Sequence, residues 1–152
     1  MFQAQKIHKI DTDHDVDLTW YDRIRLGAPD TLADSRVREV LTRSSKLLCG
    51  GTKVVTLATF GVPCYTAEVW EWAMHNARMV ATPDMLLSVG HSKPDLPSEL
   101  GKHTLGIASV LVPGCPREAF TLWWYPDKTK SRYLFLTSKP GQWNKGYWFC
   151  FL

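Results

Sequence analysis

The sequence predicts an α+β fold in which helices flank a mixed β-sheet. Runs of β-branched and apolar residues at 53–60, 103–112 and 131–138 are typical of strands. Helix start and stop signals lie between several of these runs. The chain has 152 residues, of which 45% are hydrophobic and 22% are charged, and this balance excludes wholesale disorder. Because this length suits one core, we expect a single domain over residues 1–152.

The first third of the chain predicts a strand, an acidic loop and a helix. QAQKIHKI is typical of a strand, and DTDHDVD follows it. A calcium loop that began at Asp11 would need glycine where Val16 stands, so we expect an exposed loop without a metal. Asp34 or Ser35 can cap the helix, and a Cys-Gly-Gly sequence at 49–51 ends it. Its apolar stripe comprises Val37, Val40, Leu41, Leu47 and Leu48.

Residues 52–72 predict a β-hairpin, in which KVVTLATF, a Gly-Val-Pro turn and the return strand CYTAEVWEW follow one another. On the return strand, Glu68 shares a face with Cys64, Trp70 and Trp72. A carboxylate that is buried among tryptophans has a raised pKa, which makes Glu68 a candidate general base. A solvated carboxylate at the sheet edge is the open alternative.

The segment after this hairpin is less regular. MHNARMVATPDMLLSV favours a short helix and an apolar strand, whereas GHSKPDLPSELGK favours a loop because it contains two prolines. Loops of that length inside a compact domain are often functional.

The C-terminal third predicts a βαβ unit. HTLGIASVLV at 103–112 is almost entirely apolar, as is typical of a central strand. Pro116 suits the first turn of a helix over 116–124, and SRYLFLTS at 131–138 supplies the second strand. We therefore expect these two strands to be parallel neighbours with a right-handed crossover. Ligands of such units bind beyond the carboxyl ends of the strands.

Charge is divided unevenly along the chain. Residues 1–100 carry 11 basic and 13 acidic side chains, whereas residues 101–152 carry 7 and 2, which gives net charges of −2 and +5. Basic residues interleaved with aromatic ones suit phosphates and stacked bases, so nucleic acid is a candidate partner of the C-terminal half. A solvated basic face over an aromatic core is the alternative.

Tryptophan is the outlier of the composition, with seven residues. Four of them lie between 123 and 148, inside the basic half. Trp123 and Trp124 are adjacent, so on a helix they would point about 100° apart and only one could pack on the sheet. We expect the tryptophans to mark a groove or an interface, with core packing as the rival explanation.

The four cysteines form no C-x-x-C pair, which argues against a zinc site. We expect reduced, mostly buried thiols, with Cys64 and His103 as an alternative nucleophilic pair. No apolar run approaches the ~20 residues of a membrane span, and the N-terminus lacks the apolar segment of a secretory signal. These features predict a cytoplasmic protein without a membrane partner.

Six segments carry a resemblance, and they occur in the order GGTKVVTL, VWEW, LGIASVLVPG, REAFTLWW, RYLFLTSK and NKGYWF. In this order the chain resembles small, mostly phage-associated proteins related to the Mom DNA-modification proteins and, through them, to the GNAT acyltransferase fold. The resemblance covers residues 46–151. Its most telling pieces are Arg117–Ala119 and the Asn-x-Gly-Tyr sequence that ends at Tyr147.

The resemblance implies an acyltransferase that uses acetyl-CoA or a related acyl donor, with a nucleobase or another amine as acceptor. The pantetheine would pair with the central strand, and the pyrophosphate would bind at the loop after it. Tyr147, a phenol with a pKa near 10, would protonate the leaving thiolate, and Glu68 or His103 would deprotonate the amine. The cofactor-binding residues implied in this way are Leu105, Gly106, Ile107, Val112, Gly114, Cys115, Arg117 and Asn144.

Three features depart from the GNAT pattern. The loop PGCPRE after the central strand has one glycine and two prolines, and so offers fewer amides to a phosphate. The spacing from Asn144 to Tyr147 is three residues, which is shorter than in that family. The chain also reaches Leu152 before the closing strands of that fold, so we expect the sheet to lack them and to expose an edge.

Two classes of function therefore stay open. One is a GNAT-like acyltransferase of phage origin in the host cytoplasm, which would need a flipped-out base if DNA is its substrate. The other is a non-enzymatic phage structural or host-factor-binding protein that oligomerises through its aromatic C-terminal half. Nucleic-acid binding alone is a third interpretation. For Tyr147, a core position with a bonded hydroxyl is the alternative to catalysis.

Overall fold

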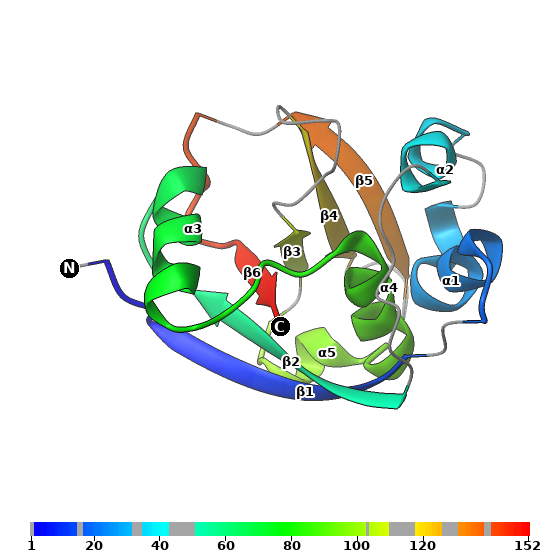
Figure 1. Cartoon of the computed structure of the whole chain (residues 1–152), viewed down its shortest axis with the longest axis horizontal. Coiled ribbons are helices and arrows are strands. Elements are labelled where there is room, and N and C mark those ends of the chain that lie inside the picture. The colour runs from blue at the N-terminus through cyan, green and yellow to red at the C-terminus, as the bar shows by residue number, and fades with distance from the viewer. Residues whose placement is uncertain are drawn as a thin grey trace.

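The computed structural model describes residues 2–14, 17–31, 35–42, 51–102, 104–109, 118–125, 131–138 and 141–152. Within these ranges, six strands form one mixed sheet with helices on both faces, which confirms the predicted α+β class (Figure 1). The strands are β1 (Lys6–His14), β2 (Gly51–Thr59), β3 (Leu105–Ser109), β4 (Glu118–Trp124), β5 (Arg132–Ser138) and β6 (Trp148–Phe151). The helices are α1 (Trp20–Gly27), the 3₁₀ helix η1 (Pro29–Thr31), α2 (Ser35–Thr42), α3 (Thr66–His75), α4 (Pro83–Ser92) and α5 (Leu96–Glu99).

The sheet has the order β1-β2-β6-β3-β4-β5, so the last strand in the sequence lies between β2 and β3. β6 pairs antiparallel with β2 and parallel with β3, and every other neighbouring pair is antiparallel. All four residues of β6 are buried. β6 therefore joins an N-terminal pair of strands to a C-terminal meander of three strands.

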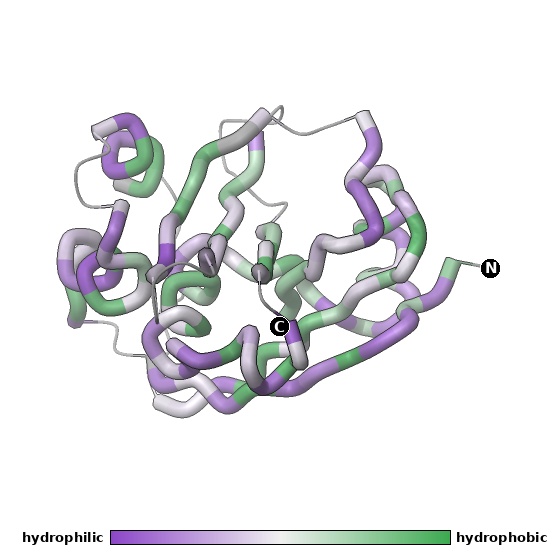
Figure 2. Tube along the Cα trace, turned by 180° about the vertical axis from the view of Figure 1, so that it is seen from behind, coloured by the Kyte–Doolittle hydropathy of each residue, from purple (hydrophilic) through white to green (hydrophobic). Residues whose placement is uncertain are grey.

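Alternation along the strands directs side chains into two separate cores. Trp148 and Cys150 of β6 belong to the larger core with α1, α2, α4 and α5, whereas Phe149 and Phe151 belong to the smaller core beneath α3. Figure 1 shows α3 on one side of the sheet and α1, α2 and α4 on the other. In Figure 2 hydrophobic segments concentrate in the interior, and the outer strand β1 is largely hydrophilic.

The predicted strand runs at 53–60, 103–112 and 131–138 are confirmed as β2, β3 and β5, and β3 is central and fully buried. The strand predicted at 3–10 is β1, but it continues to His14, so the expectation of an acidic loop is wrong for Asp11 and Asp13. Both aspartates are exposed, and the buried Thr12 lies between them as strand alternation requires.

The hairpin predicted at 52–72 is wrong in its second half, because residues 66–75 form α3. At the start of this helix, Glu68 Oε1 accepts a hydrogen bond from the backbone N–H of Tyr65. Val69, Trp72 and Ala73 are buried at helical spacing against the sheet. The alternating pattern of residues 64–72, which predicted a strand, does not reflect the secondary structure of this segment.

The predicted βαβ unit is also wrong. Residues 118–124 form β4, in which Phe120, Leu122 and Trp124 enter the larger core at alternate positions. β4 pairs antiparallel with both β3 and β5, so β3 and β5 are not neighbours and no crossover connects them. The parallel neighbour of β3 is β6.

The remaining helices also differ in part from the sequence-based expectations. The apolar strand predicted within residues 74–89 and the loop predicted at 90–102 give way to α4 and α5. The sequence analysis missed α1, whose N-cap Thr19 accepts a hydrogen bond from the backbone of Asp22. The predicted helix after Ser35 is confirmed as α2, with Val37, Val40 and Leu41 buried. Its predicted stop before β2 lies outside the described residues.

The larger core depends on a close approach between α1 and α4. A Cβ atom on Gly90 would lie 2.1 Å from the carbonyl oxygen of Gly27, and one on Gly27 would lie 2.2 Å from the carbonyl oxygen of Leu87. Both obstacles are backbone atoms, so neither can move aside alone. α4 is buried from Pro83 to Gly90, and Met85, Leu86, Leu87 and Val89 belong to the larger core.

Gly90→Ala should therefore destabilise the protein, although alanine is ordinarily the better helix former. We expect a loss of about 1–3 kcal/mol in the free energy of unfolding, as for other overpacked sites. Urea denaturation measures this loss. Gly141→Ala is the control, because a Cβ atom there meets nothing within 4 Å. Equal effects of the two substitutions would contradict the packing argument.

Candidate functional site, an aromatic face of the sheet

Five aromatic side chains gather on the C-terminal half of the sheet, on the face that carries α3. We call them the aromatic cluster, and they are Trp123, Tyr125, Tyr133, Phe135 and Tyr147. Trp123 belongs to β4 and Tyr125 follows that strand, Tyr133 and Phe135 belong to β5, and Tyr147 directly precedes β6.

Strand alternation explains why these rings share a face. Leu122 and Trp124 of β4 and Leu134 of β5 enter the larger core, so the residues between them point to the opposite side. Trp123 lies directly opposite Tyr133 in the antiparallel register. Aromatic residues in opposed positions on neighbouring strands make favourable cross-strand pairs.

The rings form a continuous series of contacts. The centroids of Trp123 and Tyr147 are 5.5 Å apart in an edge-to-face arrangement, and those of Tyr125 and Tyr133 are 5.4 Å apart. Tyr133 and Phe135 are stacked at 5.8 Å. Such pairs each contribute about 0.5–1.5 kcal/mol beyond the area that they bury. The cluster is therefore a fixed surface rather than a set of independent side chains.

The aromatic cluster is only partly covered. Tyr125 is 38% exposed, and the other four members are half-buried. Among the described elements, α2 and α4 pack on the face of β4 and β5 that carries the larger core, which is the opposite face. Aromatic faces that remain partly accessible on a rigid sheet can stack on a planar ligand.

The Trp123 indole packs on Gly106. A Cβ atom at this position would lie 2.7 Å from two carbons of the Trp123 ring, so the indole lies directly against the backbone of β3. Gly106 pairs with Trp123 across the two strands. The sequence analysis assigned Gly106 to a cofactor, and the structure gives it this packing role.

Two residues of the N-terminal part secure β5, which is an edge strand. The backbone N–H of Arg132 donates to the Asp30 carboxylate at 2.8 Å, and that of Leu134 donates to Thr31 Oγ1 at 2.6 Å. The Arg132 guanidinium is buried and donates to the carbonyl of Gly27 at 2.9 Å. Burial lowers the pKa of Arg132, and the Asp30 charge opposes this effect. Arg132 therefore serves the fold and does not face the cluster.

Tyr147 couples the cluster to β2 and to the smaller core. Its backbone carbonyl accepts a hydrogen bond from Thr59 Oγ1 at 2.9 Å, and its ring contacts Trp143 at 4.9 Å. Burial raises the pKa of the Tyr147 phenol, and the neighbouring Tyr125 raises it further. The phenol therefore stays protonated at neutral pH and can act as a hydrogen-bond donor.

Glu68, the predicted general base, lies in α3, whereas Tyr147, the predicted acid, directly precedes β6. Glu68 accepts a hydrogen bond at Oε1 from the backbone N–H of Tyr65 at 2.9 Å, at the N-terminus of α3. It also lines a groove of about 730 Å³ between α3 and the N-terminal segment, together with Phe2 and Trp72. The premise that Glu68 lies on a strand among tryptophans is wrong, because α3 is a helix.

The predicted cofactor strand is paired on both sides. Leu105, Gly106 and Ile107 pair with β4, and Ile107 and Ala108 also pair with β6. The parallel pair extends over only two residue pairs before the strands separate.

The chain's own residues 79–81 pair with β6 beyond this point. Val80 forms a bridge with Phe151, and Ala81 donates to the carbonyl of Cys150 at 3.1 Å. The hydroxyl of Ser109 at the end of β3 donates to the Ala81 carbonyl. Residues 79–81 therefore link the diverging ends of β3 and β6, where a pantetheine would have to pair.

The remaining predicted residues divide into two groups. Asn144 is exposed, and its Oδ1 accepts a hydrogen bond from the Gly146 backbone at 2.9 Å, three residues before Tyr147. His103, Val112, Gly114, Cys115 and Arg117 lie outside the described residues. The structure therefore does not test the predicted pairing of Cys64 with His103.

The two described cysteines are buried thiols, as expected. Burial and then the Glu68 charge raise the pKa of Cys64 to about 11, and burial raises the pKa of Cys150 as well. Both therefore stay protonated at neutral pH and are weak nucleophiles. Among the described residues, no group of three or more His, Cys, Asp or Glu side chains could hold a metal.

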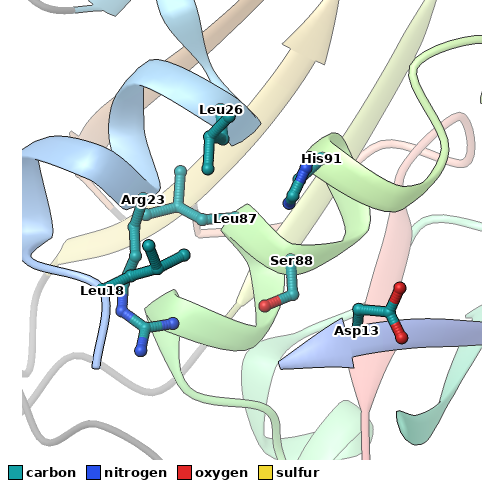
Figure 3. Close-up of a pocket in the computed structure, with 7 residues that line it drawn as sticks. All are labelled: Asp13, Leu18, Arg23, Leu26, Leu87, Ser88 and His91. Atoms are coloured by element: carbon teal, nitrogen blue, oxygen red, sulfur yellow. The ribbon is translucent and has the colours of Figure 1, made fainter. Parts of the chain in front are cut away.

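A second hollow lies between the end of β1, α1 and α4. Figure 3 shows that Arg23 and Leu26 come from α1, and Leu87, Ser88 and His91 from α4. Its volume of about 10 Å³ is enough for about one water molecule. This hollow is too small for a substrate.

The tryptophans divide between core and surface. Trp72, Trp124, Trp143 and Trp148 are buried, so core packing accounts for four of the seven. Trp123 is half-buried in the aromatic cluster, and Trp70 is exposed on α3. The sequence analysis missed Tyr125, Tyr133 and Phe135. Trp123 and Tyr125 alternate along one strand, as do Tyr133 and Phe135 along the next. The helix predicted at 116–124 concealed the first alternation, so the second was not connected with it.

Comparison with protein-family models, with curated proteins and with solved structures finds no match to this chain. In the described part of the chain, no helix has both the length and the apolar character needed to cross a membrane.

The packing of Trp123 on Gly106 predicts an energetic coupling. Gly106→Ala should lower the free energy of unfolding by about 1–3 kcal/mol, because the new methyl group displaces the indole. In a Trp123→Ala background the same substitution should cost much less. A double-mutant cycle by chemical denaturation measures this difference. Additive effects would show that the indole does not depend on Gly106.

Proposed function

We propose that this protein binds single-stranded nucleic acid by stacking bases on the aromatic cluster. The observation that carries the proposal is the placement of five contacting rings on one partly exposed half of a sheet face. Stacking of a base on an aromatic side chain contributes about 1–3 kcal/mol and tolerates every base. Such a surface suits unpaired strands, because bases in a duplex are already stacked.

Charge supports this proposal. Residues 101–152, which contain the whole cluster, have a net charge of +5. Arg132 is used by the fold, but Lys145 is exposed in the turn before Tyr147. Cations that neutralise phosphates release counterions and supply most of the sequence-independent affinity.

We place the protein in the cytoplasm, which is the host cytoplasm under the phage origin that the resemblance implies.

Tyr125→Ala provides the direct test, because Tyr125 is the most exposed member of the cluster. We expect the substitution to weaken binding of a single-stranded oligonucleotide of about 12 residues by 1–3 kcal/mol. Fluorescence anisotropy of the labelled oligonucleotide measures the affinity. The affinity should also fall steeply as salt rises, because phosphate contacts carry part of it.

Tyr21→Ala is the matched control, since Tyr21 is a tyrosine of α1 that is 54% exposed and lies away from the cluster. It should leave the affinity unchanged. Equal losses in the two variants, or binding that does not respond to salt, would argue against the proposal. If Tyr125→Ala loses self-association rather than oligonucleotide binding while Tyr21→Ala loses neither, the aromatic half is an oligomer interface instead.

Acyl transfer from acetyl-CoA or a related donor to a nucleobase or another amine stays a prediction of the resemblance. Tyr147, whose phenol is held protonated beside the parallel pair β3–β6, is the feature that favours it. The link between β3, β6 and residues 79–81 opposes it, because a pantetheine would have to displace those residues. Isothermal titration of the protein with acetyl-CoA tests it: a measurable heat of binding would support acyl transfer, and the absence of binding would argue against it.

A further inference from the structure

The groove of about 730 Å³ between α3 and the N-terminal segment is large enough for a ligand, in contrast to the hollow beside α1. Figure 1 shows the N-terminal segment passing beside α3 before it enters β1. The helix lines the groove with four side chains at the spacing of one helical face, which are Glu68, Glu71, Trp72 and His75. The volume lies within the range of sites that bind small molecules.

The walls of the groove are fixed by contacts within the chain. Phe2 stacks on Phe60 with ring centroids 4.3 Å apart, and Phe60 contacts the Trp72 ring edge to face at 5.4 Å. The backbone N–H of Gln5 donates to the carbonyl of Thr59 at 2.8 Å, which ties the N-terminal segment to β2. A groove with fixed walls loses less conformational entropy when a ligand binds.

The polar atoms on the helical side of the groove are mainly hydrogen-bond acceptors. His75 Nδ1 lies 2.9 Å from the carbonyl oxygen of Glu71, so Nδ1 carries the proton and Nε2 of the neutral ring is an acceptor. Asn76 donates through its amide nitrogen to the Trp72 carbonyl at 2.8 Å and keeps its Oδ1 as an acceptor. The carboxylates of Glu68 and Glu71 can only accept. A ligand that fits this side must therefore supply hydrogen-bond donors.

The charge of the groove is negative, although the whole chain has a net charge of +3. Glu68 and Glu71 line the groove, and no Lys or Arg of the described residues does. Neither carboxylate lies within ion-pair distance of a Lys or Arg in the described part of the chain. The electrostatic complement of this groove is a cation, whereas the phosphates of a nucleic acid would be repelled.

Apolar side chains line the opposite wall. Phe2 is half-buried, and Ile7 of β1 is 53% exposed. On the exposed face of β1, Ile7 is followed at alternate positions by Lys9, Asp11 and Asp13. The strand therefore changes from apolar to charged where it leaves the groove. An apolar group that covered Ile7 and the Phe2 ring would contribute about 25 cal/mol for each Å² removed from water.

We propose that this groove binds a small organic ammonium ion, in which a protonated amine is attached to an apolar body. The ammonium group donates to the carboxylates of Glu68 and Glu71, and the apolar body lies against Phe2 and Ile7. Glu68 Oε1 is bonded to the Tyr65 backbone, so Oε2 is the oxygen that receives the ligand. The proposal does not depend on nucleic-acid binding, because the aromatic cluster belongs to other elements.

Titration of the full chain with phenethylammonium, followed by two-dimensional amide NMR, tests the proposal. We expect millimolar affinity for so small a probe, with chemical-shift changes concentrated at residues 2–7 and 68–76. The uncharged phenethyl alcohol and the anion phenylpropionate should each bind at least about tenfold more weakly, because neither offers a charged donor to the carboxylates. No binding of phenethylammonium, or equal binding of the alcohol, would overturn the proposal.

Glu71→Gln removes one negative charge from the groove and keeps an oxygen acceptor. It should weaken phenethylammonium binding by about three- to tenfold. Asp11→Asn is the matched control, because it removes the same charge from the exposed face of β1 at a position that does not line the groove. Equal weakening by the two substitutions would reveal a general effect of net charge and would contradict binding in the groove. Oligonucleotide affinity should not fall in Glu71→Gln, so this proposal and the proposed function fail independently.

Ile7→Thr tests the apolar wall separately. Threonine keeps the β-branched shape that suits a strand, so the thermal denaturation midpoint should change little at this exposed position. Binding of phenethylammonium should weaken by about threefold, since apolar contact area with the phenyl ring is lost. Unchanged affinity would show that the apolar body does not lie against β1, and the proposed binding mode would then be wrong.

Discussion

The insertion of β6 between β2 and β3 is the constraint on which the rest of the structure depends. β6 has four residues, and all are buried because the strand is covered on both faces and paired on both edges. Trp148 and Cys150 fill the larger core while Phe149 fills the smaller one, so a short aromatic strand connects both cores. Without β6, the β1–β2 pair and the β3–β4–β5 meander would each expose an edge and lose a shared interior.

The same insertion determines where the aromatic cluster lies. Tyr147 directly precedes β6, and its backbone is tied to Thr59 of β2, so the position of its ring follows from the position of the strand. Trp123 then packs between Tyr147 and the bare backbone of Gly106. At the far edge, Asp30 and Thr31 satisfy backbone groups of β5 and hold the strand that carries Tyr133. The rings are thus placed by groups distant in sequence, and little of their arrangement depends on local preference.

Sequence patterns predicted the elements whose chemistry is local. β-branched and apolar runs identified β2, β3 and β5, because these strands are buried and lack the helical period. The sequence analysis predicted a strand at 64–72, where the structure has a helix, and a helix at 116–124, where it has a strand. A short aromatic run fits both the helical and the strand period, so the outcome depends on tertiary packing. The structure identifies α3 by the burial of Val69, Trp72 and Ala73 at helical spacing, and β4 by its pairing with two strands. No local pattern places the last strand of the chain in the centre of the sheet, so the cluster could not be assembled from sequence.

The divergence of β3 and β6 decides what kind of ligand this sheet can accept. Parallel pairing lasts for two residue pairs, after which residues 79–81 bond to β6 and the Ser109 hydroxyl ties them to β3. An extended ligand that paired with the strand backbone would have to break these hydrogen bonds and uncover Val80, which is buried. A planar ligand on the aromatic cluster would break none of them, because it would contact ring faces above the strands. These hydrogen bonds are therefore consistent with the proposed recognition over the face of the sheet and oppose insertion of a ligand between its strands.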